Sequence, residues 1–162
     1  MREQDLRKHR CCFTGHRPEK LNISELCLRQ MLDKEIDQAI QDGFTVFLSG
    51  MAKGVDINAA ELVLKRKEID PRLKLVCVLP FDGFGLHWSS EWTNRYLSIL
   101  NQADRVQIVC KNPSMSAYQR RNEWMVDRSA RVIAVYHGAK GGTKNTIDYA
   151  KRNQVPCVIL TP

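Results

Sequence analysis

Residues 44–60 read FTVFLSGMAKGVDINAA, which is a short apolar run, a glycine-bearing turn and the start of a helix. The run Phe44–Leu48 is mostly apolar, as expected of a parallel strand covered on both faces. Gly50 and Gly54 allow a positive φ or a close approach of the backbone within the turn. A strand that passes through such a turn into a helix is the repeating unit of α/β folds.

The same alternation extends along the whole chain. Strands are predicted at Arg10–Thr14, Phe44–Leu48, Lys74–Leu79, Arg105–Cys110, Arg131–Tyr136 and Val155–Leu160. Helices are predicted between Ser24 and Gly43, from about Asp56 to before Pro71, from Ser89 or Ser90, from about Ala117 to Ser129, and from Thr143 to Asn153. Right-handed β-α-β units predict an α/β fold, a three-layer α/β/α Rossmann-like sandwich with a mainly parallel sheet of about six strands.

The chain of 162 residues is expected to form one Rossmann-like domain over residues 10–162, preceded by a charged segment at residues 1–9. It has no apolar run long enough to span a membrane and no signal peptide, so we expect a cytoplasmic protein without a membrane partner. The six cysteines form no C-x-x-C motif and are interpreted as small buried apolar side chains. We expect neither a bound metal ion nor a cofactor.

The positive charge is concentrated in the second part of the chain. Residues 1–104 carry 15 basic and 15 acidic side chains, whereas residues 105–162 carry 10 basic and 3 acidic ones. The net charge of +7 therefore comes entirely from the later residues. Such a distribution favours an anionic partner, including nucleic acid, although a solvated surface with scattered lysines accounts for it equally well.

Three glycine-bearing turns follow predicted strands, at residues 14–18, 49–56 and 138–143. The carboxyl ends of parallel strands lie at one edge of the sheet, where open α/β folds bind their ligands. Backbone N–H groups at the start of a helix bind anions well. The three turns together therefore predict recognition of a phosphate or a nucleotide.

Side chains in and near these turns complete the predicted site. Ser49 is expected to donate to a phosphate, and Asp56 either caps its helix or accepts from a ribose hydroxyl. Arg17 suits a bidentate phosphate contact, whereas His16 is either an acid–base group or a hydrogen-bonded structural residue. The predicted ligand-binding residues are Thr14, Gly15, His16, Arg17, Ser49, Gly50, Gly54, Asp56, Trp88, Glu91, Arg121, Asn122, Gly141, Gly142 and Thr143. No residue is assigned a catalytic role.

These motifs resemble the SLOG superfamily of Rossmann-like nucleotide-binding proteins and, within it, the YpsA-like group. The resemblance rests on residues 12–18, CFTGHRP, and on Leu79-Pro80-Phe81 with Trp88 and Tyr96. Residues 49–56 and Arg121-Asn122 are also similar to motifs of the DNA-processing protein of natural transformation, a SLOG relative that binds single-stranded DNA. The resemblance implies nucleotide binding in signalling or regulation, and self-association into a homo-oligomer.

A third branch, the Lonely Guy phosphoribohydrolases, has a catalytic glutamate shortly after its glycine-rich turn. This chain has Asn145 and Thr146 at those positions, and Asp148 lies a further turn along the helix. The leading hypothesis is therefore a cytosolic sensor that binds a nucleotide-like small molecule. Two alternatives stay open: hydrolysis of a nucleotide N-glycosidic bond, with Asp56 or Glu91 as the carboxylate, and binding of single-stranded nucleic acid.

Overall fold

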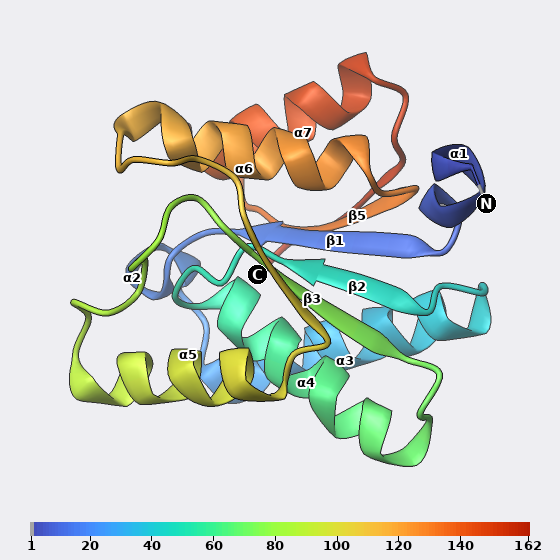
Figure 1. The fold of residues 1–162 in the computed structure, drawn as a ribbon, viewed down its shortest axis with the longest axis horizontal. Helices are drawn as coiled ribbons and strands as arrows, with labels where there is room; N and C mark the ends of the chain where they lie inside the picture. Colours follow the sequence, from blue (N-terminus) through green and yellow to red (C-terminus); the bar gives the residue numbers. More distant parts are fainter. Residues whose placement is uncertain (1) are drawn as a thin grey trace.

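A computed structural model describes residues 2–162. Its six strands form one parallel sheet in the order β4-β3-β2-β1-β5-β6 (Figure 1). Their bounds are β1 Arg10–Gly15, β2 Val46–Ser49, β3 Lys74–Leu79, β4 Arg105–Ile108, β5 Arg131–Val135 and β6 Cys157–Leu160. The predicted Rossmann-like α/β/α fold is confirmed.

Five of the helices were predicted and two short ones were not. The bounds are α1 Glu3–Arg7, α2 Pro18–Leu21, α3 Glu25–Gln41, α4 Val55–Ile69, α5 Ser90–Gln102, α6 Met115–Asp127 and α7 Gly142–Arg152. The Ser24 side chain accepts a hydrogen bond from the Cys27 N–H at 3.1 Å, so α3 begins where the sequence places it. The missed helix α2 has Pro18 at its start, where proline's fixed φ suits a helix.

Helices cover the sheet on both faces. On one face lie α3, α4 and α5 (Figure 1). They pack over a core in which Phe13 and Phe47 stack with ring centroids 6.0 Å apart. On the other face α6 and α7 pack over Cys12, Leu48 and Val132. No helix among residues 2–162 is long and apolar enough to cross a membrane.

The order of the strands indicates where a ligand crevice is expected. From β1 the chain moves outward through β2 and β3 to β4, and α6 then returns it to β5 on the opposite side of β1. The strand order therefore reverses between β1 and β5, and ligands of open parallel sheets bind at such a reversal, beyond the carboxyl ends of the strands. The turns that follow β1, β2 and β5 are the three turns singled out in the sequence.

Candidate functional site

The first two turns pack directly against each other, and their glycines leave the space that this contact requires. A Cβ atom on Gly15 would lie 2.6 Å from the Cβ of Val55, the first residue of α4. Gly54 has φ +94°, and a Cβ there would lie 3.0 Å from Cδ of Pro18. Both glycines thus allow the turn after β1 to pack against the turn after β2, so neither of their Cβ directions is open to a ligand.

In the second turn the serine hydroxyl is already used. Ser49 is fully buried, and its hydroxyl donates to the backbone oxygen of Asp56 at 2.9 Å and accepts from the Met51 N–H at 3.2 Å. The positive φ falls on Met51, at 62°, rather than on Gly50. The predicted phosphate contact of Ser49 remains a prediction, and it would require this hydroxyl to give up its donated hydrogen bond.

Asp56 is a buried carboxyl group with one unpartnered oxygen. The residue is 6% exposed and lies in the first turn of α4, whose N-cap is Gly54. Its Oδ2 accepts from the Ala52 N–H at 3.2 Å, whereas Oδ1 is buried without a hydrogen-bond partner among residues 2–162. Burial raises the pKa of Asp56 to about 6, and the charge of Arg121 opposes that rise.

The buried guanidinium of Arg121, which belongs to α6, lies near Asp56. It is 4% exposed, and a Cβ on Gly50 would lie 2.9 Å from its Cζ, so only glycine leaves room for it there. Its Nη1 donates to the Gly50 backbone oxygen, and its Nε donates to Asn122 Oδ1 at 2.8 Å. Within residues 2–162 its Nη2 has no hydrogen-bond acceptor and it forms no ion pair with a carboxylate. Burial lowers the pKa of Arg121, and Asp56 opposes that change.

The third turn, by contrast, is open. Gly138 and Gly141 have positive φ angles of 105° and 143°, and a Cβ on either would meet nothing within 4 Å. A Cβ on Gly142 would have the side-chain nitrogen of Asn122, 4.0 Å away, as its nearest neighbour. Thr143, which follows, is 6% exposed. Arg121-Asn122 and Gly141-Gly142 are therefore brought to one place, as the predicted ligand site requires.

His16 links the first turn to the third. It is 6% exposed, and its ring centroid lies 4.2 Å from that of His137, just before Gly138. Its Nε2 accepts from the His137 N–H at 3.4 Å. Burial and the neighbouring His137 lower the pKa of His16. The predicted contact residues beside it differ in exposure, since Thr14 is 6% exposed and Arg17 lies at the surface as the N-cap of α2.

The segment between β3 and α5 forms a packed aromatic cluster. Phe84 is 8% exposed, and its ring lies edge-on to that of Trp88 at 5.2 Å. The Arg121 Cζ lies 5.6 Å from the Phe84 ring, so the cluster borders the buried guanidinium. Lys53 Nζ lies 5.9 Å from the centroid of the Trp88 ring. The other predicted contact residue of this segment, Glu91, is exposed. Phe84 is not among the predicted ligand-binding residues, because its contact with Arg121 depends on the approach of α6, which is distant in the sequence.

Comparison with known proteins identifies the family. The model of the YspA SLOG family matches residues 11–161. This chain belongs to that family. Within residues 2–162 of this SLOG chain, no three or more His, Cys, Asp or Glu side chains gather in a way that could hold a metal ion.

Two curated bacterial relatives extend over most of the SLOG domain. The uncharacterized SPbeta prophage-derived protein YoqJ of Bacillus subtilis strain 168 is 32% identical over 118 residues, which are 65% of this chain and 69% of YoqJ. A UPF0398 protein of Halalkalibacterium halodurans is 28% identical over 151 residues, 88% of this chain and 80% of that protein.

Among solved structures, DNA processing protein A of Helicobacter pylori is similar with a TM-score of 0.66 and 19% identity. The similarity covers 97% of this SLOG chain and 66% of that one. That structure concerns the way in which the Helicobacter protein binds single-stranded DNA. At this identity the similarity establishes a shared fold.

Proposed function

We propose that this protein is a cytoplasmic sensor that binds a nucleotide or a nucleotide derivative in the crevice between β1 and β5. Its phosphate group would lie at the start of α7, against the Gly141 and Gly142 backbone and beside the Asn122 amide and the free Nη2 of Arg121. A hydroxyl of the ligand would donate to Asp56 Oδ1, once the side chains that cover this buried oxygen shift to admit it. The single observation that carries the proposal is the buried Asp56 Oδ1, which has no hydrogen-bond partner among residues 2–162 and lies near the buried guanidinium of Arg121.

Burying a charged group without full hydrogen bonding is unfavourable by several kcal/mol. Folded proteins keep such groups mainly where function requires them. Asp56 retains an acceptor without a donor, and Arg121 retains a donor without an acceptor, at the same edge of the sheet. A ligand that carries both a hydroxyl and an anionic group would satisfy the two side chains together, and a phosphorylated ribose has both.

The open third turn supports the position of the phosphate. Helix α7 has 11 residues, and within residues 2–162 no side chain caps its start, where a helix favours negative charge. The free space around Gly141 and Gly142 allows an anion to approach the backbone directly.

A ligand panel tests this proposal by thermal shift, with mono-, di- and cyclic nucleotides, ADP-ribose, NAD and a short thymidine oligomer. At one hundred times its dissociation constant a ligand adds about 2.7 kcal/mol of stability, which raises Tm by about 5–10 °C for a chain of this size. We expect this shift for one of the small nucleotides. We expect Gly142→Val to abolish it, because the branched side chain would occupy the open space beside Asn122.

The matched control is Ser90→Val, which places the same side chain at the exposed first residue of α5. It should leave the ligand-induced shift unchanged. A folded Gly142→Val protein with wild-type nucleotide affinity would contradict the phosphate position. A shift with the oligomer alone would favour nucleic acid over a nucleotide.

The nucleic-acid alternative depends on the basic side chains of residues 105–162, and two of these are less available than the sequence suggests. Arg121 is buried, and Lys144 forms an ion pair with Asp148 at 2.6 Å, whereas Arg120 is exposed. Any oligonucleotide binding should then be weak and should fall steeply with salt concentration.

One observation favours an enzyme as the second candidate function. The pKa of Asp56 is raised to about 6, a range in which a carboxyl group can act as a general acid or base. In the reaction, water would add to the ribose C1′ while the N-glycosidic bond breaks and the base leaves with a proton. Liquid chromatography after incubation with the bound nucleotide tests this candidate. Release of the free base by the wild type but not by Asp56→Asn would support an enzyme, and an intact nucleotide after prolonged incubation would contradict it.

A further inference from the structure

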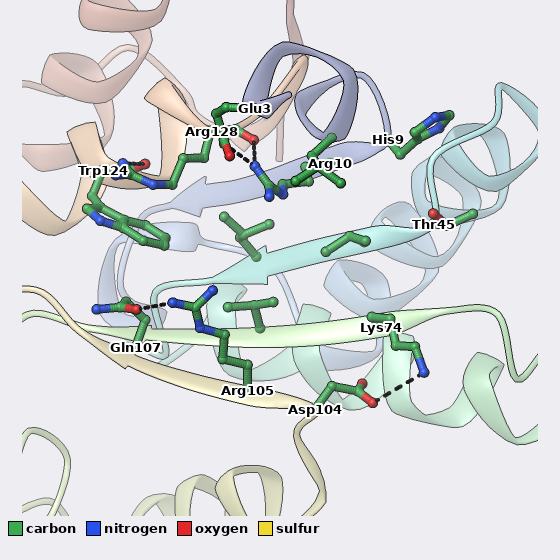
Figure 2. Close-up of a pocket in the computed structure, with 14 residues that line it drawn as sticks. Glu3, His9, Arg10, Thr45, Lys74, Asp104, Arg105, Gln107, Trp124 and Arg128 are labelled. Carbon is green, nitrogen blue, oxygen red and sulfur yellow. Dashed lines mark hydrogen bonds and ion pairs between the residues drawn. The ribbon is translucent and has the colours of Figure 1, made fainter. Parts of the chain in front are cut away.

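A second concavity lies on the α6 face of the sheet, toward the amino ends of the strands (Figure 2). It is a groove of about 630 Å³ between α6 on one side and β4 on the other, with α1 beside it. Its lining residues come from α1, β1 to β4 and α6, so it shares no turn with the crevice proposed for the nucleotide.

The floor of the groove is apolar and comes from the two strands beneath it. Val46 and Leu48 belong to β2, and Val76 belongs to β3. Val46 and Val76 are only partly buried, since α6 and α7 pack mainly over Cys12, Val132 and the neighbouring strands. This part of the sheet is left available to an apolar ligand.

The walls carry two guanidinium groups without a counter-charge. Arg128 lies over the Trp124 ring, with its Cζ 4.0 Å from the centroid, and donates to the Trp124 backbone oxygen at 3.2 Å. On the opposite wall Arg105 donates to Gln107 Oε1 at 2.6 Å (Figure 2). Neither arginine forms an ion pair with a carboxylate among residues 2–162.

The other cations of the groove have carboxylates nearby. Arg10 pairs with Glu3, and Lys74 Nζ lies 3.8 Å from Asp104 Oδ1, which also pairs with Lys67 at 2.5 Å. The groove therefore carries an excess of positive charge, to which Arg105 and Arg128 contribute from its two sides without an ionic partner of their own among residues 2–162 (Figure 2).

We propose that this groove binds a small organic anion with a flat apolar body and one acidic group. The valine and leucine floor accommodates the apolar body, and the Trp124 indole offers an edge or a face for aromatic contact. Arginine guanidinium groups match planar acidic groups such as carboxylates and sulfonates. The volume of about 630 Å³ is within the range of small-molecule sites.

Charge argues against a second copy of this chain as the occupant. The chain has a net charge of +7, so another copy would bring like charge toward the unpaired Arg105 and Arg128. A small anion provides the missing counter-charge and covers the apolar floor at the same time.

The test uses anilinonaphthalene sulfonate as the probe and the neutral N-phenylnaphthylamine as its uncharged counterpart. Binding to the full chain is measured by fluorescence titration and by calorimetry. The double variant Arg105→Gln/Arg128→Gln should weaken binding of the sulfonate by about tenfold or more, because both charge-assisted contacts are lost. Binding of the neutral probe should be unaffected.

The matched control is Arg120→Gln/Arg152→Gln. It removes the same net charge outside the groove, and Arg152, like Arg128, lies over an aromatic ring. An equal loss of affinity in the control would overturn the proposal, as would wild-type affinity in the groove variant or no binding to the wild type.

Two further measurements keep the outcome clear. If the double variant does not fold, Arg105→Gln alone, on the exposed edge strand β4, replaces it, and it should also weaken binding of the sulfonate. Sedimentation with and without the probe distinguishes the second occupant. Dimers that the probe dissociates, and that the groove variant no longer forms, would assign the groove to a second copy and overturn the proposal.

Discussion

The turns after β2 and β5 have similar sequences, but their glycines have different roles. In the turn after β2, Gly50 leaves room for Arg121, and Gly54 packs against Pro18. In the turn after β5, Cβ atoms on Gly138 and Gly141 would meet nothing within 4 Å. A glycine in a strand-to-helix turn can thus serve packing within the protein or leave space for a ligand. The sequence alone does not distinguish the two roles.

The neighbours of each turn explain the difference. Strands β2 and β5 both have a strand on either side, but the turn after β2 lies between the turn after β1 and the incoming helix α6. The turn after β5 leads into α7, and its glycines have no such neighbour. The turn after β2 therefore supplies the buried Asp56 and the space for Arg121 of α6, and the turn after β5 supplies the open anion site that we propose beside them.

The largest expected effect concerns the charge of Asp56. The pKa rises from 3.8 in the unfolded chain to about 6 in the folded protein, which corresponds to about 3 kcal/mol of lost stability once the group ionises. Asp56→Asn keeps the shape of the side chain without the charge. We expect it to raise the free energy of unfolding by about 3 kcal/mol near pH 7.5.

The sign of this effect reverses the usual behaviour of carboxylates. Because the folded pKa is above the unfolded one, Asp56 favours folding below pH 3.8, and this contribution is lost as the pH rises through about 6. The difference between Asp56→Asn and the wild type should therefore vanish near pH 4. Urea titrations at the two pH values measure it. A less stable Asn variant near pH 7.5 would mean that Arg121 compensates the carboxylate fully.

The next prediction compares a glycine that is packed against another residue with a glycine that has free space around it. Gly15→Ala would place a methyl group against Val55 and should lower the free energy of unfolding by about 2 kcal/mol through overpacking. Gly142→Ala meets only Asn122 at 4.0 Å and should stay within about 0.5 kcal/mol of the wild type. Urea denaturation measures both. Equal losses in the two variants would remove the distinction between packed and open turns.

Much of the fold follows from local patterns. The apolar runs, the Ser24 cap and the glycine-bearing turns place all six strands and the five longer helices, and β3 occupies the predicted Lys74–Leu79. Some strands begin or end at other residues than predicted, because backbone groups near their ends form hydrogen bonds outside the sheet. Strand β6 begins at Cys157 rather than Val155, because the Val155 N–H donates to the backbone oxygen of Ala150 at the end of α7.

The site is less predictable because its main features depend on long-range contacts. Arg121 is an arginine on a mostly polar helix, and only the approach of α6 to Gly50 buries it. The positive φ of Met51 breaks the rule that glycine takes such positions. The groove over Val46 and Val76 depends on what α6 leaves uncovered. No local sequence pattern encodes any of these three features.

The smallest effect tests the contact that joins the first turn to the third. His16 Nε2 accepts a hydrogen bond from the His137 N–H, so it must be unprotonated, and the pKa of His16 is lowered below its usual 6.5. Its contribution to stability is complete above pH 6.5 and is lost as the pH falls through the folded pKa, opposite in direction to that of Asp56. His16→Gln should flatten the loss of stability between about pH 7 and pH 5, with an effect smaller than either described above. Urea midpoints of variant and wild type at both pH values measure this difference. Parallel pH profiles would show that the two turns are not coupled through this histidine and that the third turn is held by α7 alone.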